Sequence, residues 1–264
     1  MPRIVSVINL SAESRNRDSV VHSPEELLRR ATSGRAAGAA AIEIGARSSS
    51  AESPVVSERE EQRRLLPALR LLKREGFRVS VDTWSPATAA IAASEGADIL
   101  NFTGSELPPE LLRAIAAGAG AVVIAYAPFG DPYAMRTAAP SVPTDADLRA
   151  YFEPRIAAAN DAGIGEVILD PNLGIVHSSI RANREFLMAF RTSLAFRAVR
   201  LFGEDHAVML DHPRRDAGDA PAVWAMMLLN LAPDYLRTHD PELVQRLGDA
   251  LRRVEGGAAP GGET

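Results

Sequence analysis

Cysteine is absent from the 264 residues of this chain. Its absence excludes disulfides, thiolate zinc sites, iron–sulfur clusters and a cysteine nucleophile. A cysteine-free chain suits a reducing compartment, so we expect the protein in the cytoplasm. Lysine is almost as scarce, because Lys73 is the only one, and it falls within a predicted helix.

Long hydrophobic runs and an excess of positive charge are also missing. The most apolar stretch, AGAGAVVIAYA at 117–127, is far shorter than the roughly 18 residues that span a bilayer. The first residues lack the apolar segment of a signal peptide. The formal net charge of -5 and pI of about 5.6 disfavour a broad nucleic-acid-binding face. We therefore expect a soluble protein that binds neither membrane nor nucleic acid.

Short apolar runs alternate with longer segments of helical period along most of the chain. The runs are rich in Val and Ile and continuously hydrophobic, which is typical of parallel strands covered on both faces. They occupy residues 4–10, 40–46, 78–83, 98–104, 121–127, 166–172, 206–211 and 234–240. Eight strand–helix units in about 250 residues predict an α/β fold, a single-domain (β/α)8 TIM barrel over 1–253. An open doubly wound sheet is the alternative, and we expect a disordered tail at 254–264.

Polar residues gather where the predicted strands end, and in such a barrel these ends form the active-site face. Asp82, Asn101 and Asp170 supply hydrogen-bond acceptors suited to an NH-rich heterocycle. A second set supplies donors suited to a phosphate or another anion, and its members are Asn9, Arg237 and His239.

Each of these residues also has a purely structural interpretation. Asp82 precedes Ser85-Pro86 and could cap the following helix, and Asn101 could cap or turn its loop. Asp170 begins Asp-Pro-Asn, which is a good turn sequence. Glu43 lies inside a strand, which favours a buried acid paired with an arginine. It is the joint position of the polar residues at one rim that indicates a ligand site.

Seven segments in order resemble dihydropteroate synthase and the wider pterin-binding barrel family, from about residue 4 to about residue 250. The segment RVSVDT is a close match to the family's third-strand motif, and VILDPNLG resembles its Asp-Pro-Gly-x-Gly segment. The other five are INLSAES (8–14), IEIGARSSS (42–50), ILNFTG (99–104), GDPYAM (130–135) and LRTHD (236–240).

The resemblance implies a pterin substrate and a role for each strand-end residue. Asp82, Asn101 and Asp170 correspond to the family's pterin-binding residues. Asn9, Arg237 and His239 correspond to the residues that act on the diphosphate leaving group, with Mg²⁺ bound to the diphosphate and Asn9 as its protein ligand. In the family's reaction, a pterin methylene is transferred from diphosphate to the amine of 4-aminobenzoate.

The chain departs from the family pattern where the second substrate binds. The family's Ser-Arg-Lys after strand seven is replaced by a segment without lysine, in which His212, Arg214 and Arg215 are the candidate substitutes. Loop 2 has Arg47 in place of the family's Glu, together with Ser49 and Ser50 in place of Thr and Arg. The altered loops indicate a divergent member with a changed second-substrate site.

Three functions remain open at this point. The first is a pterin transferase that uses 6-hydroxymethyl-dihydropterin diphosphate and another amine or other nucleophile. The second is a non-catalytic pterin-binding paralogue, and the third is a methyl-tetrahydrofolate-binding methyltransferase domain. We also expect a homodimer through helices at 182–200 and 221–232, with Trp224, Met226 and Met227 as possible contacts, although these faces could equally pack on the barrel.

Overall fold

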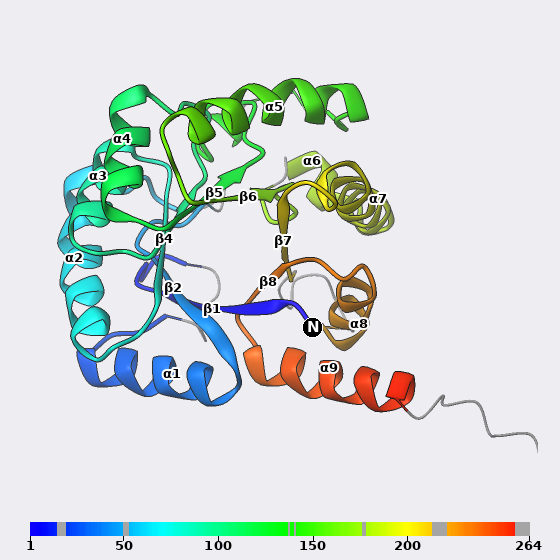
Figure 1. Cartoon of the computed structure of the whole chain (residues 1–264), viewed down its shortest axis with the longest axis horizontal. Helices are drawn as coiled ribbons and strands as arrows, with labels where there is room; N and C mark the ends of the chain where they lie inside the picture. Colours follow the sequence, from blue (N-terminus) through cyan, green and yellow to red (C-terminus); the bar gives the residue numbers. More distant parts are fainter. Residues whose placement is uncertain are drawn as a thin grey trace, which may run out of the picture.

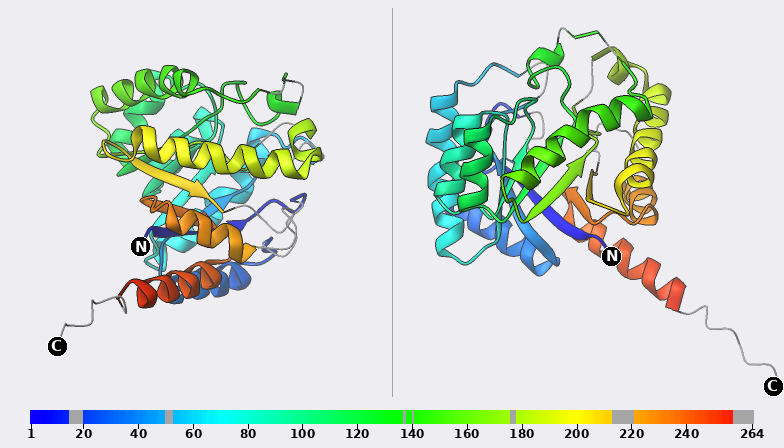
Figure 2. Two further views of the ribbon diagram at one scale, coloured as in Figure 1. Left: turned by 90° about the vertical axis from the view of Figure 1, so that its right-hand side faces the viewer. Right: turned by 45° about the horizontal axis from the view of Figure 1, so that its top comes forward.

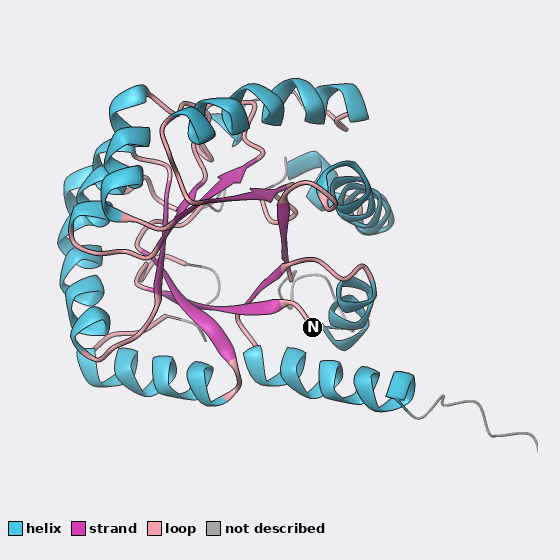
Figure 3. Cartoon of the chain, in the orientation of Figure 1, coloured by secondary structure: helices cyan, strands magenta, loops and turns pink. Residues whose placement is uncertain are grey.

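The computed structural model describes residues 1–14, 20–49, 53–136, 138–139, 141–175, 178–212 and 221–256. Its strands form a closed parallel barrel in the order β1 to β8 (Figures 1 and 3). They are β1 (Arg3–Asn9), β2 (Ala39–Gly45), β3 (Val79–Thr83), β4 (Ile99–Phe102), β5 (Ala121–Ala125), β6 (Glu166–Asp170), β7 (Ala207–Asp211) and β8 (Tyr235–Thr238). The predicted (β/α)8 barrel is confirmed, and the closed ring excludes the open doubly wound sheet.

Helices surround the barrel on its outer side (Figure 1). They are α1 (Pro24–Ala36), α2 (Glu58–Arg74), α3 (Pro86–Ser94), α4 (Pro109–Gly118), α5 (Asp145–Asp161), α6 (Ser178–Ala182), α7 (Arg184–Phe202), α8 (Pro221–Asn230) and α9 (Pro241–Gly256), with a short 3-10 turn, η2 (Ala134–Arg136). Among them, η2 and α6 lie in the loops after β5 and β6 and have no counterpart in the sequence prediction. Helix α9 ends at Gly256, and the rest of the predicted tail, 257–264, lies outside the described residues.

Local sequence signals explain where several helices begin. Ser23 accepts a hydrogen bond from the Glu26 amide at 3.2 Å, and Pro24 fills the first position of α1, where no amide donor is needed. At the start of α5, the side chains of Thr144 and Asp147 each accept a hydrogen bond from the other residue's backbone N–H. Two amide donors that have no partner within the helix are thereby satisfied. Such caps fix the points at which each loop leaves the strand ends.

The barrel interior is apolar at the end where the strands begin. Side chains from every strand except β3 fill it as one buried cluster, which consists of Val5, Ala41, Ile99, Ala121, Val123, Ile168, Met209 and Tyr235. A much larger cluster lies between the strands and the helices. Because apolar side chains close the lower half, polar groups and any ligand are confined to the carboxyl ends of the strands, whose loops gather at one end of the barrel in the left view of Figure 2.

Helix α8 packs its aromatic side chain onto the barrel. Trp224 is only 2% exposed, so of the two interpretations left open for it, packing on the barrel is the one that the structure shows, and a dimer contact through this side chain is excluded. Met226 and Met227 are half-buried against the same core, and Met227 Sδ accepts a hydrogen bond from Thr192 of α7 at 3.5 Å. In the described part of the chain, no helix is long and apolar enough to cross a membrane.

Candidate functional site

A cavity opens at the carboxyl ends of the strands and is called the main cavity below. It encloses about 1130 Å³, its open mouth included. Its lining residues are Val7, Asn9, Ser11, Ser14, Gly45, Arg47, Ser48, Ser49, Asp82, Trp84, Asn101, Thr103, Asp170, Asn172, Gly174, Ile175, Arg191, Asp211 and Arg237. The acceptors predicted from three different strands therefore share one cavity.

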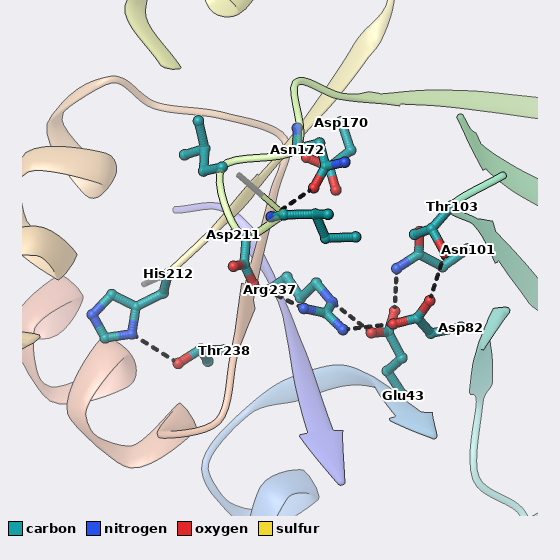
Figure 4. Close-up of polar contacts among 12 residues, drawn as sticks. Glu43, Asp82, Asn101, Thr103, Asp170, Asn172, Asp211, His212, Arg237 and Thr238 are labelled. Atoms are coloured by element: carbon teal, nitrogen blue, oxygen red, sulfur yellow. Dashed lines mark hydrogen bonds and ion pairs between the residues drawn. The ribbon is translucent and has the colours of Figure 1, made fainter. Parts of the chain in front are cut away.

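Arg237 of β8 lies at the centre of the cavity floor and binds three carboxylates (Figure 4). Its Nε donates to Glu43 Oε1 at 2.5 Å. Its Nη1 donates to Asp211 Oδ1 at 2.9 Å, and its Nη2 donates to Asp82 Oδ2 at 3.0 Å. Although burial opposes its charge, these carboxylates hold the pKa of Arg237 well above its ordinary value.

Glu43 is fully buried on β2 and joins Arg237 to the neighbouring strands. Its Oε2 accepts hydrogen bonds from Ser80 Oγ and from Asn101 Nδ2, each at 3.0 Å. Both oxygens of the buried Glu43 carboxylate are thus hydrogen-bonded, which offsets the free-energy cost of removing the charge from water. Glu43 is a structural acid in this chain, in keeping with its position inside a strand.

Asn101 presents a carbonyl oxygen that has no protein partner in the described part of the chain. Its Nδ2 is committed to Glu43, which fixes the orientation of the amide. Its Oδ1 is buried, bonds no other described residue and belongs to a residue that lines the main cavity. Because a buried acceptor without a donor costs about 1–3 kcal/mol, this atom indicates a ligand that supplies an N–H or O–H group.

Asp82 and Asp170 flank Asn101 on either side of the cavity. Ser85 accepts the Thr88 amide hydrogen bond and so caps α3, which leaves Asp82 free of the capping role considered for it. Asp82 instead accepts a hydrogen bond from Thr103 at 3.3 Å and binds Arg237. Asp170 does make a turn, since its Oδ1 accepts the Asn172 amide at 2.7 Å, and it lines the cavity as well.

Both aspartates are held where the charged form is disfavoured. Burial raises the pKa of Asp82 to about 7, with Arg237 opposing and Glu43 adding to the rise. Burial likewise raises the pKa of Asp170 to about 7, against the Asn172 amide and with Asp211. A ligand that brings N–H donors or positive charge would relieve this excess of buried negative charge.

Asn172 shapes the wall between β6 and the loop after β5. Its φ of 62° lies in the left-handed region, which favours glycine or asparagine, and the resembling family segment has glycine at this position. The side chain adds what glycine lacks: Nδ2 donates to the Tyr126 carbonyl at 2.9 Å, and Oδ1 accepts the Ile175 amide at 3.1 Å. These bonds tie together two loops that border the cavity.

The loops after β1 and β2 form the other side of the cavity, where hydroxyl and amide groups dominate. Asn9 Nδ2 donates to Ser14 Oγ at 3.3 Å, and the remaining hydroxyls come from Ser11, Ser48 and Ser49. The guanidinium of Arg47 lies over the Trp84 ring, 4.5 Å from its centroid, and forms an ion pair with Glu61. This side offers donors suited to an anion.

Arg47 lies at the edge of the cavity and pairs with a carboxylate behind it, Glu61. Glu61 is fully buried and accepts hydrogen bonds from Thr83 Oγ1 at 2.7 Å and Thr88 Oγ1 at 2.9 Å. The side chain of Arg47 is 8% exposed, and its Nε is buried without a hydrogen-bond partner among the described residues. A second unmatched group, here a donor, therefore borders the main cavity.

The remaining predicted residues lie elsewhere. His239 is half-buried and is absent from the cavity lining. His212 is buried, with Nδ1 3.1 Å from Thr238 Oγ1 and Nε2 2.8 Å from the Pro221 carbonyl, and it does not line the cavity either. Ser50, Arg214 and Arg215 lie outside the described residues.

Sequence reasoning missed several lining residues that the structure adds. The position of Asp211 at the end of its strand could be inferred from the sequence, but its ion pair with Arg237 could not. Arg191 comes from α7 and donates to the Leu173 carbonyl at 2.8 Å, a position that no strand-end pattern indicates. Trp84 and Thr103 follow directly after β3 and β4 and share the strand-end signal used for the other residues.

No protein-built metal centre is found among the described residues, where no group of three or more His, Cys, Asp or Glu side chains could hold an ion. Asn9 supplies a carboxamide oxygen, a ligand type that Mg²⁺ accepts beside phosphate oxygens and water. This residue suits an ion that arrives with a diphosphate better than a resident metal.

Comparisons with known proteins find relatives that match most of the chain. Dihydropteroate synthase type-2 of Escherichia coli is 29% identical over 250 residues, covering 90% of this chain and 90% of that protein. Dihydropteroate synthase type-3 of Escherichia coli is 26% identical over 262 residues, covering 96% and 98%.

Solved structures of dihydropteroate synthase from Thermus thermophilus superpose on the whole barrel. The complex with 4-aminobenzoate has a TM-score of 0.75 at 26% identity and covers 96% of this chain and 94% of that one. The complex with 6HMPPP has a TM-score of 0.73 at 25% identity, covering 97% and 94%. A family model described as pterin binding enzyme matches residues 5–202, from β1 through α7. The chain therefore belongs to the family of pterin-binding enzymes.

Proposed function

We propose that this protein binds a pterin carrying a methylene diphosphate, namely 6-hydroxymethyl-dihydropterin diphosphate, and transfers the pterin methylene to an amine. The observation that carries the proposal is the shared lining of one cavity by Asp82, Asn101 and Asp170, where the buried Oδ1 of Asn101 accepts no hydrogen bond from any described residue. Three acceptors that converge on a cavity match a ligand edge rich in N–H groups.

The pyrimidine part of a pterin has such an edge, since it carries an amino group beside a ring N–H. In this proposal the two aspartates and Asn101 accept hydrogen bonds from it. Their buried carboxylates gain from the donors because each lacks the hydration that it would have in water. The relative from Thermus thermophilus in complex with 6HMPPP supports a ligand of this class.

The diphosphate lies toward the loops after β1 and β2. The polar groups that line the cavity there are the Asn9 amide, the hydroxyls of Ser11, Ser14, Ser48 and Ser49, and the guanidinium of Arg47. Among the described residues of these loops that line the cavity, Arg47 is the one with a full positive charge, and its buried Nε has no hydrogen-bond partner in the described part of the chain. Asn9 would be the protein ligand of a Mg²⁺ ion that arrives with the diphosphate, and such an ion would supply further charge neutralisation.

In the reaction, the bond between the methylene carbon and the diphosphate oxygen breaks, and the diphosphate leaves with the electron pair. A bond forms between that carbon and the amine nitrogen, which releases its proton to solvent. Donors around the diphosphate stabilise the negative charge that grows on the leaving oxygen, so the residues of this chain need supply no strong general base.

Arg237 has a different task in this proposal from the one implied by resemblance alone. Its three donor groups bind Glu43, Asp82 and Asp211, so it orients Asp82 toward the pterin and holds the carboxylates apart. The same observation favours a second candidate function, the binding of a pterin without turnover. Because three carboxylates already neutralise its guanidinium, Arg237 stabilises the negative charge of a leaving diphosphate less than an arginine without such partners would.

Pyrophosphate release distinguishes the two functions. Protein is mixed with 6-hydroxymethyl-dihydropterin diphosphate, Mg²⁺ and a panel of amines, and the release of pyrophosphate is followed with and without each amine. Release that depends on both protein and amine is the expected result. Binding of the pterin without release by any amine would leave the non-catalytic function, and no binding would overturn both.

Cytoplasmic location and a homodimer stay predictions from the sequence. For the dimer, the side chains available on α7 and α8 are those exposed in this chain, Phe186, Phe196 and Val223, rather than Trp224.

A further inference from the structure

Asp211, the last residue of β7, is fixed in the wall of the main cavity by contacts with β8 (Figure 4). Its Oδ1 accepts a hydrogen bond from Arg237 Nη1 at 2.9 Å. The backbone directly after it is also bound, since the His212 amide donates to the Arg237 carbonyl at 2.8 Å. The position of this carboxylate is therefore set before any ligand binds.

The second oxygen of the same carboxylate, Oδ2, accepts no hydrogen bond from any residue that the structure describes. It lies beside Gly174 of the loop after β6, which lines the same cavity. A Cβ at position 174 would be 2.9 Å from Oδ2, so glycine leaves this oxygen uncovered. Because Asp211 is only 9% exposed, few water molecules can solvate it. A carboxylate oxygen held in this way is an acceptor for an N–H group.

In the proposed function, the pterin and its diphosphate occupy other parts of the main cavity. The pterin acceptors stand on β3, β4 and β6, and the diphosphate lies toward the loops after β1 and β2. A carboxylate repels a diphosphate. Strand β7 follows β6 in the ring and leads through β8 to β1. A group bound at Asp211 therefore borders the place where the pterin ring continues into its methylene diphosphate.

We propose that Asp211 is a catalytic residue of the transfer, whose Oδ2 accepts a hydrogen bond from the attacking amine and takes the proton that the nitrogen loses. This inference rests on the proposed function and adds the residue that receives the amine. The nitrogen lone pair forms the bond to the methylene carbon, while the carbon–oxygen bond breaks and the diphosphate leaves with its electron pair.

The proton then moves from nitrogen to Oδ2. The electron pair of the N–H bond returns to nitrogen, and Asp211 passes the proton on to solvent, which regenerates the carboxylate. A nitrogen that has gained a bond to carbon becomes acidic, so a carboxylate is basic enough for this step.

Asp211→Asn replaces the acceptor with a donor at a defined atom. A guanidinium N–H needs an acceptor, so Arg237 holds the new amide oxygen in the place of Oδ1 and leaves the amide NH2 beside Gly174. The value of kcat/KM for amine-dependent pyrophosphate release should fall about a hundredfold, with the affinity for the pterin diphosphate almost unchanged. Asp205→Asn is the matched control, because it removes the same charge at an exposed position before the amino end of β7.

Gly174→Ala covers the same oxygen without changing any charge. The φ of Gly174 lies outside the left-handed region, so alanine suits the backbone, but its methyl group must displace Oδ2. Amine-dependent release should fall as it does in Asp211→Asn. Gly120→Ala is the control, because a Cβ there, at the amino end of β5, would meet the Asp98 carbonyl at an ordinary 3.8 Å.

Paired amines show whether Asp211 acts on the N–H group itself. Aniline and 4-aminobenzoate are each compared with the N,N-dimethyl derivative, which has no N–H to donate. Each is titrated calorimetrically into protein loaded with 6-hydroxymethylpterin, pyrophosphate and Mg²⁺, a complex that has no leaving group and cannot react. The wild type should bind at least one primary amine about tenfold more tightly than its dimethyl derivative, and Asp211→Asn should lose that preference.

The outcomes separate the inference from the function on which it rests. Equal effects of Asp211→Asn and Asp205→Asn, an N–H preference that survives in Asp211→Asn, or no saturable binding of either primary amine would overturn the inference while leaving the pterin site intact. Failure of the pterin diphosphate to bind the wild type would overturn the proposed function, and the inference would fall with it.

Discussion

Glu43 and Arg237 lie 194 positions apart in the chain and form a 2.5 Å ion pair inside the barrel. The pair joins β2 to β8, the two strands on either side of β1, and its two members also bind groups on β3, β4 and β7. One buried guanidinium thereby fixes the side chains that form the floor of the main cavity. Arg237 thus lies on the last strand of the closed barrel and also positions the carboxylates of the main cavity.

Removal of the Glu43 charge should cost stability. Glu43→Gln keeps the shape of the side chain but leaves the buried Arg237 with one carboxylate fewer. Breaking a buried ion pair in this way destabilises by about 3–5 kcal/mol, and the two carboxylates that remain near Arg237 put the expected loss at the lower end. Urea denaturation followed by circular dichroism measures it.

The matched control is Arg63→Gln, which removes an ion pair with Glu60 at the surface. Arg63 has a side chain that is 73% exposed, and surface pairs contribute about 0–1 kcal/mol. Equal losses in Glu43→Gln and Arg63→Gln would contradict the central role of the buried pair.

Stability should fall as the pH rises toward neutrality. The pKa of Asp170 is about 7 in the folded protein and about 3.9 in an unfolded chain. Between these values the folded protein holds a proton that the unfolded chain has lost, so the free energy of unfolding decreases with pH. The group contributes a decrease of about 2–3 kcal/mol from pH 5 to pH 8.

Asp170→Asn removes this titration, and the slope of unfolding free energy against pH should become markedly flatter. Asp82 titrates in the same range, so the slope should not vanish. Asp161→Asn serves as the control, because Asp161 is exposed at the end of α5. An unchanged slope in Asp170→Asn would show that burial of this carboxyl has no such effect.

Asn172 should be more tolerant of glycine than of alanine. Both substitutions lose the bonds to Tyr126 and Ile175, but only alanine adds the strain of a side chain at φ 62°. This strain is about 1 kcal/mol or more, and thermal unfolding should therefore rank the variants wild type, Asn172→Gly, Asn172→Ala. Asn172→Ala as stable as Asn172→Gly would mean that the backbone relaxes out of the left-handed region.

Arg47 should matter for the diphosphate and little for the pterin ring. Arg47→Lys keeps a positive charge opposite Glu61 but loses the planar fork and the Nε donor. Affinity for the pterin diphosphate should fall about tenfold, with affinity for the same pterin lacking phosphate almost unchanged. Arg149→Lys, at an exposed position of α5, is the control, and equal weakening of both ligands would contradict the assignment.

The barrel and much of its site could be predicted from the sequence because both depend on local pattern. Continuous Val- and Ile-rich runs at regular spacing predicted the parallel strands, and the residues that end those runs include Asp82, Asn101 and Asp170, which do line one cavity. In a closed parallel barrel, strand ends converge whatever the loops contain.

What the sequence left open depends on contacts between distant residues. The direction in which a strand-end side chain points is set by packing, so His212 turns to Thr238 and the Pro221 carbonyl while Asp211, one position earlier, turns to Arg237. The ion pairs of Arg237 with three carboxylates involve four strands, and no local sequence pattern predicts them. Arg191 comes from a helix rather than from a strand end.

Calorimetric titration with 6-hydroxymethyl-dihydropterin diphosphate and Mg²⁺, on the wild type and on Asp170→Asn, tests the central claim most directly. Asparagine keeps the size of the side chain but replaces an acceptor oxygen with a donor. The account predicts saturable one-to-one binding to the wild type and at least tenfold weaker binding to Asp170→Asn. No binding to the folded wild type, or equal affinity in both proteins, would contradict a pterin held by the acceptors of the main cavity.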